Sequence, residues 1–378
     1  MITAYVGAVP FDGLRLRPGR CLLVEGRRVL GLAEAPPAGA RVVPLRGGIL
    51  APGFVDVQVN GGGGAMLNDA PTPATMSRIA AAHRALGTTA LLPTLITDTA
   101  AKTRAALEAA ALRPPGVLGL HLEGPHLATA RRGAHDAALM RPLTEADVAL
   151  YAAARPRVGV LMVTLAPEMA PVELIARLVR AGVIVSLGHS DCTAEQAAAA
   201  FAAGARGVTH LFNAMSGLDH RAPGLAAAAL TAPGAWGGII ADGHHVAPRM
   251  LRLALAAKRG PGRLFWVSDA MAPVGAEGDG FLLQGRPVRR VDGAGLPRLE
   301  LCDGTLAGAA LDMGAAVRFA AAALEETPAA ALRRATADPA AFLRVSRRHG
   351  RLVPGERADL VHLDEGLALR RVWHAGEP

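Results

Sequence analysis

The chain has 378 residues, of which 51% are hydrophobic, 19% charged and only 3% aromatic, and its formal net charge is +8. Such a length holds one large barrel domain with a second, smaller domain, or two to three ordinary domains. The positive charge does not predict nucleic-acid binding, because the basic residues are scattered and no basic run is interleaved with aromatic residues.

The two ends of the chain predict a small β domain. Residues 1–50 contain short apolar runs interrupted by glycine and proline, and they show no helical period. The tail, residues 350–378, returns to runs of the same kind. The clearest runs of strand length are 20–25, 27–32, 359–363 and 369–374. We expect strands from both ends to pair in one discontinuous β-sandwich domain, with residues 51–349 forming a separate domain.

Residues 51–349 predict an α/β fold, because apolar runs of strand length alternate with helical patterns. The predicted strands are 54–60, 89–95, 117–123, 158–165, 184–189, 208–212, 238–241 and 264–268. The predicted helices between them include 73–86, 100–111, 145–154, 172–180, 193–203 and 248–258. Eight repeats with uninterrupted hydrophobic strands favour a closed (β/α)₈ barrel of the TIM type. A doubly wound parallel sheet is the alternative.

After the eighth strand the alternation breaks. Two strand-like runs, 281–290 and 297–301, flank Asp292-Gly293 and predict a β-hairpin insertion. Helical patterns then resume at 313–324 and 329–336.

The segment 184–215 carries the strongest chemical signal. It contains two short apolar runs that each end in a histidine, with an alanine-rich helical pattern between them. Thr193 is the expected N-cap of that helix, with Gln196 completing a capping box. A strand–helix–strand unit places its strands parallel, so His189 and His210 should lie at the carboxyl ends of neighbouring strands. That rim is where α/β barrels place their active sites.

Polar residues at the other predicted strand ends complete a candidate metal site. Glu123, His189 and His210 form a two-histidine, one-carboxylate set that suits Zn²⁺, and Fe²⁺, Mn²⁺ and Co²⁺ accept the same ligands. Three protein ligands leave one coordination position open for water. Asp269, at the end of the last strand, is placed to act as a general base and then as a general acid.

The sequence predicts one metal ion per subunit rather than two. Gln58 and Asn60 occupy the first strand where a two-metal barrel would carry a His-x-His pair, and amides are poor ligands for such ions. The fourth strand offers no lysine that could be carboxylated to bridge two metals. In the loops, Arg221 can bind phosphate through its planar guanidinium.

Several motifs together resemble the N-acetylglucosamine-6-phosphate deacetylase family of the amidohydrolase superfamily. They are APGFVDVQVNGGGG at 51–64, HLEGPHL at 121–127, LGHSDCT at 187–193, THLFNAM at 209–215, IADGHHV at 240–246, VSDAMAP at 267–273, LAGAALDMG at 306–314 and GRLVPGERADLV at 350–361. The resemblance covers nearly the whole chain. It implies Glu123, His189 and His210 as metal ligands, and Asp269 as the catalytic aspartate.

The same resemblance implies a set of substrate contacts. These are Ala134, His135, Asn213, Ala214, Arg221, His245, Leu306, Ala307 and Gly308. Asn213, Ala214 and Arg221 match the phosphate side, where the family's arginine reaches into a neighbouring subunit, so the resemblance also implies a homodimer. The chain departs from the family pattern at Ala222, which replaces an acidic residue, and at His126, which replaces an aromatic residue.

We therefore expect metal-dependent hydrolysis of N-acetylglucosamine 6-phosphate to glucosamine 6-phosphate and acetate. The alternatives are a deacetylase of another acylated sugar phosphate, such as N-acetylgalactosamine 6-phosphate, a hydrolase of a cyclic amide, and a non-catalytic barrel that binds sugar phosphates. The three cysteines are far apart and predict neither disulfides nor a thiolate zinc site. No basic start followed by an apolar run predicts a signal peptide, and no apolar stretch reaches the roughly 18–20 residues that span a bilayer, so we expect a cytoplasmic protein with no membrane partner.

Overall fold

The computed structural model describes residues 1–278, 280–293 and 295–377, and it divides into two compact units. We call them the barrel unit, formed by Val57–Ala82 and Leu91–Leu311, and the terminal unit, formed by Met1–Asp56, His83–Ala90 and the residues from Asp312 onward. The domain boundaries expected near residues 50 and 349 stay predictions, and position 378 lies outside the described residues.

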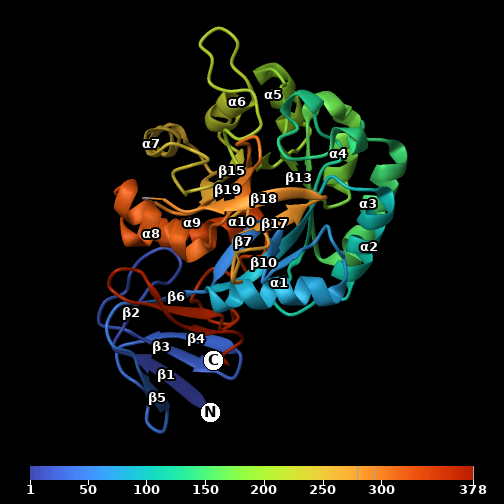
Figure 1. Cartoon of the computed structure of the whole chain (residues 1–378). Coiled ribbons are helices and arrows are strands. Elements are labelled where there is room, and N and C mark those ends of the chain that lie inside the picture. Colours follow the sequence, from blue (N-terminus) through green and yellow to red (C-terminus); the bar gives the residue numbers. More distant parts are fainter. Residues whose placement is uncertain (279, 294, 378) are drawn as a thin grey trace. The chain divides into compact units, whose positions relative to one another are not determined.

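Eight parallel strands form one sheet whose neighbours follow the order of the chain (Figure 1). They are β7 (Phe54–Val59), β10 (Thr88–Ile96), β11 (Gly119–Glu123), β12 (Val160–Leu165), β13 (Ile184–Leu187), β14 (Gly207–Val208), β15 (Trp236–Ile239) and β16 (Leu264–Trp266). The sheet closes because Val59 forms a parallel bridge with Ala270 and the Asp269 N–H donates to the Gln58 carbonyl at 3.1 Å. The predicted (β/α)₈ barrel is confirmed, and the doubly wound alternative is excluded.

The strands read as continuous apolar runs because both of their faces are covered. All nine residues of β10 and all six of β12 are buried, as expected for a sheet with side chains on the inside and helices on the outside. Several strands end earlier than predicted. The predicted strand 208–212 is only Gly207–Val208 in the structure, because the backbone turns into the left-handed region at His210 (φ 30°).

The helices that accompany the strands agree closely with the predicted ones. They are α1 (Pro73–Ala85), α2 (Ala100–Ala111), α3 (Glu145–Val158), α4 (Val172–Arg180), α5 (Ala194–Ala202), α6 (Leu225–Thr231) and α7 (Pro248–Ala257). Figure 1 shows α2 to α5 following one another around the outer side of the strands. The sequence did not predict α6, whose seven residues are too few to show a period. Single 3₁₀ turns occur at Thr129–Arg131, Ala137–Leu139 and Pro167–Met169.

The capping box predicted for α5 is present. The Thr193 hydroxyl accepts the Gln196 N–H at 3.3 Å, and the Gln196 side-chain carbonyl accepts the Thr193 N–H at 3.0 Å. Two of the free N–H groups at the start of the helix are therefore satisfied. This fixes the start of the helix that follows β13 and His189.

The insertion after β16 is a four-stranded antiparallel sheet rather than a single hairpin. Its strands are β17 (Gly280–Leu283), β18 (Arg286–Val291), β19 (Arg298–Leu301) and β20 (Leu306–Ala309). The prediction of one strand over 281–290 was wrong. Gln284 and Gly285 form a two-residue turn with φ of 49° and 79°, and this positive-φ geometry matches the twist of a tight hairpin. A short hairpin of β8 (Gly61–Gly62) and β9 (Ala65–Met66) completes the strands of the barrel unit.

The terminal unit contains two further four-stranded sheets. One has the order β4 (Arg28–Ala33), β3 (Cys21–Glu25), β1 (Ile2–Val6), β5 (Arg41–Pro44), and the other β2 (Val9–Pro10), β6 (Ile49–Pro52), β21 (Leu360–Leu363), β22 (Leu369–Trp373). The expected pairing of the two chain ends is confirmed, because β21 pairs with β6. Tyr5 and Leu22 from one sheet and Leu50, Leu360 and Trp373 from the other belong to one buried apolar cluster.

Three helices belong to the terminal unit: α8 (Met313–Ala323), α9 (Pro328–Ala335) and α10 (Ala337–Phe342). The first two were predicted within one residue at each end. The third is separated from α9 by the single residue Thr336, and its six residues gave no separate signal. Among the described residues, no helix has the length and apolar character needed to cross a membrane.

We predict that Glu356 makes the terminal unit less stable at alkaline pH. Glu356 is 3% exposed, and burial raises its pKa to about 7, although the Arg351 N–H donates to its carboxylate at 3.2 Å. Because the folded-state pKa lies above the ordinary value of 4.5, folding favours the protonated acid, and stability falls as pH rises from about 4.5 through 7. Glu356→Gln should therefore stabilise the protein by about 1–2 kcal/mol at pH 8, after allowance for solvent screening.

Denaturation curves at pH 5 and pH 8 test this prediction. The gain from Glu356→Gln should shrink toward zero at pH 5, where the wild-type side chain is protonated in the folded state. The matched control is Glu365→Gln, at an exposed position of the same unit, which should change stability little at either pH. An equal gain from Glu356→Gln at both pH values would contradict the assignment.

Candidate active site

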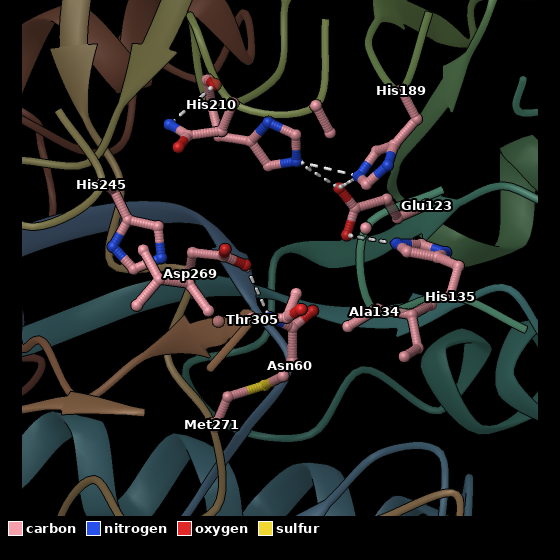
Figure 2. A pocket seen from close by; sticks show the side chains of 16 residues that line it. Asn60, Glu123, Ala134, His135, His189, His210, His245, Asp269, Met271 and Thr305 are labelled. Atoms are coloured by element: carbon pink, nitrogen blue, oxygen red, sulfur yellow. Dashed lines mark hydrogen bonds and ion pairs between the residues drawn. The ribbon is translucent and has the colours of Figure 1, made fainter. Parts of the chain in front are cut away.

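Four ionisable side chains converge at the carboxyl ends of the barrel strands. Glu123 is the last residue of β11, His189 and His210 follow β13 and β14 by two residues, and Asp269 follows β16 by three. All four line one cavity of about 270 Å³ (Figure 2). Each is nearly buried, with exposed fractions between 2% and 8%. The structure therefore brings together the four residues that the sequence singled out.

Three of these four residues have a left-handed backbone conformation. The φ angles are 47° at His189, 30° at His210 and 51° at Asp269, a region that non-glycine residues rarely adopt. Such a conformation costs about 1–3 kcal/mol and persists where surrounding contacts hold it. Here the Ala128 N–H donates to the His189 carbonyl and the Ala309 N–H to the Asp269 carbonyl, both at 2.9 Å. These strained turns aim the side chains across the barrel mouth.

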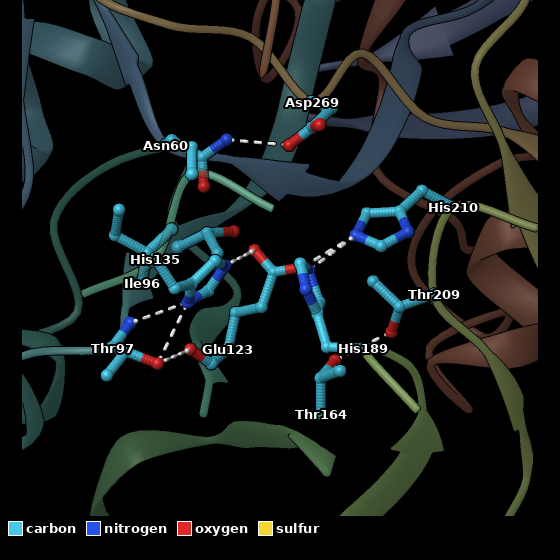
Figure 3. Close-up of polar contacts among 12 residues, drawn as sticks. Asn60, Ile96, Thr97, Glu123, His135, Thr164, His189, Thr209, His210 and Asp269 are labelled. Atoms are coloured by element: carbon cyan, nitrogen blue, oxygen red, sulfur yellow. Dashed lines mark hydrogen bonds and ion pairs between the residues drawn. The ribbon is translucent and has the colours of Figure 1, made fainter. Parts of the chain in front are cut away.

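Two imidazoles approach the same carboxylate oxygen of Glu123. His189 Nε2 lies 3.2 Å and His210 Nε2 lies 2.9 Å from Glu123 Oε1, and the two nitrogens are 3.1 Å apart (Figure 3). His189 Nδ1 donates to the Arg131 carbonyl at 2.8 Å, so in the neutral ring Nε2 carries a lone pair. That lone pair faces a carboxylate oxygen and a second imidazole nitrogen. These electron-rich atoms repel one another, and a cation bound among them would remove the repulsion.

The donor set fits a divalent metal ion. Glu123, His189 and His210 offer ligand atoms that all lie within 4.8 Å of one another. Two ligands that are each 2.0–2.1 Å from a tetrahedral ion lie about 3.3 Å apart, close to the separations between these atoms. Burial raises the pKa of Glu123, but hydrogen bonds and positive charge from the two histidines in their protonated form outweigh it and hold the pKa well below its ordinary value. The carboxylate is thus in its metal-binding form.

Asp269 lies opposite this set and is oriented by two side-chain amides. Gln58 Nε2 and Asn60 Nδ2 donate to Asp269 Oδ1 at 3.0 and 2.7 Å. Gln58 Nε2 also donates to Glu123 Oε1 at 3.2 Å, so one amide connects the acid to the ligand set. Burial, together with the charge of Glu123, raises the pKa of Asp269 to about 6. A carboxyl group with this pKa can both accept and return a proton near neutral pH.

His245 and His135 flank the cavity from two sides. His245 Nδ1 lies 2.6 Å from Asp242 Oδ2, which leaves Nε2 as the nitrogen available to a ligand. Burial opposes ionisation of Asp242, but hydrogen bonds from His245 and the backbone hold its pKa below its ordinary value. His135 Nδ1 accepts the Thr97 N–H at 3.3 Å, and burial lowers the pKa of His135 to about 3, so the ring is neutral.

A hydrogen-bonded polar layer supports the site from inside the barrel. His121 Nε2 lies 2.7 Å from the Thr164 hydroxyl, which lies 2.6 Å from the Thr209 hydroxyl. The Ser186 hydroxyl lies 2.7 Å from the same Thr209 hydroxyl. Burial lowers the pKa of His121 to about 4, so this ring is neutral as well. Because Thr209 precedes His210 directly, the layer positions a candidate metal ligand.

Most of the expected substrate contacts line the cavity, and two do not. Those in the cavity wall are Ala134, His135, Asn213, Ala214, His245, Leu306 and Gly308. Ala307 is fully buried in an apolar cluster with residues of the inserted sheet. Arg221 is exposed and lines a separate hollow with Asp191 and Asp219. The structure therefore places neither Ala307 nor Arg221 in contact with the cavity.

The cavity wall also includes residues that the sequence did not assign to the site. They are Asn60, Ile96, Gly133, Met271 and Thr305. Asn60 gave a signal as a polar strand end beside Gln58, and Met271 lies in the VSDAM motif two residues after Asp269. The sequence gave no signal for Thr305. This residue belongs to the loop between β19 and β20, and the position of that loop at the cavity depends on how the inserted sheet folds.

Comparisons with known proteins agree with this geometry. The sequence profile of the amidohydrolase family matches residues 49–271. The N-acetylgalactosamine-6-phosphate deacetylase of Shewanella sp. (strain ANA-3) is 44% identical over 340 residues, which cover 88% of this chain and 84% of the relative.

Two solved structures match the whole chain. The crystal structure of N-acetylglucosamine-6-phosphate deacetylase from Pasteurella multocida has a TM-score of 0.93 and 30% identity, covering 100% of this chain and 99% of that one. The other is a variant of the Mycobacterium smegmatis N-acetyl-D-glucosamine-6-phosphate deacetylase in complex with N-acetyl-D-glucosamine-6-phosphate. It has a TM-score of 0.91 and 35% identity, and the match covers 100% of this chain and 98% of that one.

The chain therefore belongs to the amidohydrolase family of metal-dependent enzymes, and within it to the group of amino-sugar-phosphate deacetylases. It is accordingly an enzyme that hydrolyses an amide. The Glu123–His189–His210 cluster offers ligand atoms that are close enough together to hold a metal ion.

We predict that Glu123→Gln abolishes stable metal binding. The amide keeps the shape of the side chain but removes the negative charge that two buried imidazoles face, and amides are weak ligands for such ions. Elemental analysis of purified protein should show about one ion per wild-type chain and close to none in the variant. Glu108→Gln, which breaks only an exposed ion pair with Arg157, is the control and should keep the ion. Full metal occupancy in folded Glu123→Gln would remove Glu123 from the ligand set.

Proposed function

We propose that this protein hydrolyses the acetamide of N-acetylglucosamine 6-phosphate, giving glucosamine 6-phosphate and acetate. The observation that carries the proposal is the position of Asp269, which lines the same cavity as the Glu123–His189–His210 cluster. A barrel that only bound sugar phosphates would need neither this acid nor the cluster. The Pasteurella multocida and Mycobacterium smegmatis structures, which both match the whole chain, carry the name of this activity.

The residues around the cavity divide into those that hold an ion and those that move a proton. Glu123, His189 and His210 would hold the ion, and the chemistry that a divalent ion supplies at such a set is polarisation of a carbonyl and a lowered pKa of water. Asp269 Oδ1 is held by Gln58 and Asn60, so Oδ2 is the oxygen that neither amide holds. We assign the proton transfers to Oδ2.

The reaction then needs two proton transfers at Asp269. Oδ2 accepts a proton from the attacking water as the water oxygen bonds to the acetyl carbon. His245 donates Nδ1–H to Asp242, so it stabilises the negative charge that develops on the carbonyl oxygen only when Nε2 also carries a proton, which it then donates to that oxygen. When the carbon–nitrogen bond breaks, Asp269 returns the proton to nitrogen, so a free amine and acetic acid form, and the acid loses its remaining proton to leave as acetate.

Three further features belong to the proposal. We propose Zn²⁺ as the bound ion, since two imidazoles and one carboxylate are common zinc ligands, with Fe²⁺, Mn²⁺ and Co²⁺ as alternatives. We propose a homodimer on the strength of the family resemblance. The exposure of Arg221 outside the cavity is compatible with a phosphate contact made across such a dimer. We also propose a cytoplasmic location, where sugar phosphates are found.

A second candidate substrate is N-acetylgalactosamine 6-phosphate. The specific observation in its favour is the 44% identity to the Shewanella deacetylase of that name, which exceeds the identity to the two solved structures. The two sugars differ only in the orientation of the hydroxyl at carbon 4, so the proposed chemistry at Asp269 is the same for both.

We predict that Asp269→Asn lowers kcat for acetate release by about 10²- to 10⁴-fold, the usual contribution of a general acid and base. The substitution keeps the size of the side chain but removes its ability to accept a proton. Elemental analysis of the same sample should show that the ion is retained. Asp303→Asn, at an exposed turn, is the control and should keep wild-type kcat. Wild-type turnover by metal-loaded Asp269→Asn would make the assignment wrong.

Substrate preference is a separate prediction. Acetate release measured side by side should give a higher kcat/KM for N-acetylglucosamine 6-phosphate than for N-acetylgalactosamine 6-phosphate. A ratio of about ten corresponds to roughly 1.4 kcal/mol, about one hydrogen bond to the carbon-4 hydroxyl. The reverse ratio would assign the chain to the second substrate, and no acetate from either would refute both.

A further inference from the structure

Asn60 is a buried member of the cavity wall whose backbone is fixed on both sides. It follows β7 directly and is 1% exposed. Its N–H donates to the Ala270 carbonyl at 2.9 Å, and its carbonyl accepts the Leu67 N–H at 3.0 Å. The side chain therefore starts from a rigid position at the barrel mouth, and Figure 2 shows it directed toward Asp269.

The two ends of the Asn60 side chain differ in what they contact. Nδ2 donates to Asp269 Oδ1 at 2.7 Å. An ionised carboxylate only accepts hydrogen bonds, so this contact fixes which end of the amide faces Asp269. The other end, Oδ1, is buried and has no hydrogen-bond partner among the residues that the structure describes. Buried polar atoms without a partner are rare and call for a specific explanation.

The position and chemistry of Oδ1 define the group that it can bind. An amide oxygen accepts hydrogen bonds and cannot donate them, so its partner must carry a hydrogen on nitrogen or oxygen. Asn60 lines the same cavity as Asp269, and its planar amide holds Oδ1 close to the carboxyl group that it contacts. The partner of Oδ1 is therefore a donor group bound next to Asp269.

The scissile amide supplies such a donor. Its nitrogen bears one hydrogen before the reaction, and Asp269 must reach this same nitrogen to protonate it as the carbon–nitrogen bond breaks. We propose that Asn60 is a substrate-binding residue whose Oδ1 accepts the N–H of the scissile amide, and that this contact selects secondary amides over esters. The inference rests on the proposed deacetylase function, because it takes the acetamide as the bound group.

This role differs from that of the neighbouring Gln58. Gln58 Nε2 donates to both Asp269 Oδ1 and Glu123 Oε1, and Gln58 is not among the residues that line the cavity. Gln58 is thus a positioning residue, which acts through the groups that it holds. Asn60 shares the contact to Asp269 but adds a buried acceptor without a partner among the described residues, Oδ1, which we assign to the bound substrate.

The test compares two ligands that differ in the group that links the acetyl to carbon 2, which is N–H in one and oxygen in the other. One is N-acetylglucosamine 6-phosphate, and the other is its ester analogue, 2-O-acetylglucose 6-phosphate, whose linking oxygen carries no hydrogen. Binding is measured by calorimetry in the Asp269→Asn background, where turnover is expected to be at least about a hundredfold slower and proton transfer by Asp269 plays no part. We expect the amide to bind about tenfold more tightly than the ester, the usual worth of one hydrogen bond.

Adding Asn60→Ala to the Asp269→Asn protein should weaken binding of the amide but not of the ester, so the tenfold preference should disappear. The matched control is Asn68→Ala, because Asn68 is also a buried asparagine of the barrel unit but bonds to Ile96 and Asp98 and does not line the cavity. Asn68→Ala should keep the preference. If Asn60→Ala weakens both ligands equally, Asn60 only positions its neighbours and the proposal is overturned.

The ligand comparison with Asn60 intact remains decisive even if Asn60→Ala does not fold. Equal affinity for the amide and the ester in the Asp269→Asn background would overturn the proposal without any change at Asn60. Failure of the proposed function has a different signature, since wild-type protein would then release no acetate and neither ligand would bind.

Discussion

The site depends on the close approach of two imidazoles to one buried oxygen of Glu123. Three electron-rich atoms within about 3 Å of one another repel unless a positive charge lies among them. In the absence of an ion, protons would have to supply that charge, and the hydrogen bond and charge of Glu123 outweigh the effect of burial and raise the pKa of His210. Metal binding and protonation therefore compete for the same three atoms.

The barrel makes this close approach possible because three different strands, each stabilised by its own contacts, hold the three repelling groups. Glu123 comes from β11 and the two histidines follow β13 and β14, so no single segment has to bring the charges together. The backbone at His189 and His210 adopts the left-handed conformation, and the polar layer beneath them satisfies Thr209 and His121. The stable part of the fold thus holds a locally unfavourable arrangement in place.

Much of this could be predicted from the sequence. The (β/α)₈ barrel follows from the alternation of apolar runs with helical periods, and the convergence of Glu123, His189, His210 and Asp269 follows from their positions at the ends of those runs. This worked because parallel strands place their carboxyl ends at one rim, whatever the loops do.

Features that depend on loop conformation could not be predicted in the same way. The turn at Gln284-Gly285 lacks the usual Asn-Gly signal, so one strand was expected where there are two. Thr305 reaches the cavity only because the inserted sheet folds as it does. The expected contacts at Ala307 and Arg221 were assigned by resemblance, which transfers the identity of a residue but not its exposure or the direction of its side chain.

The orientation of Asp269 has one further consequence, for the geometry of the reaction. Because Gln58 and Asn60 both occupy Oδ1, a single oxygen atom must serve the incoming water and the departing nitrogen in turn. Both must therefore come within reach of this oxygen. The water then attacks the acetyl carbon from the same side of the acetyl plane from which the nitrogen receives its proton. The side of nucleophilic approach and the side of proton delivery are coupled, and the carboxyl group need not rotate between the two halves of the cycle.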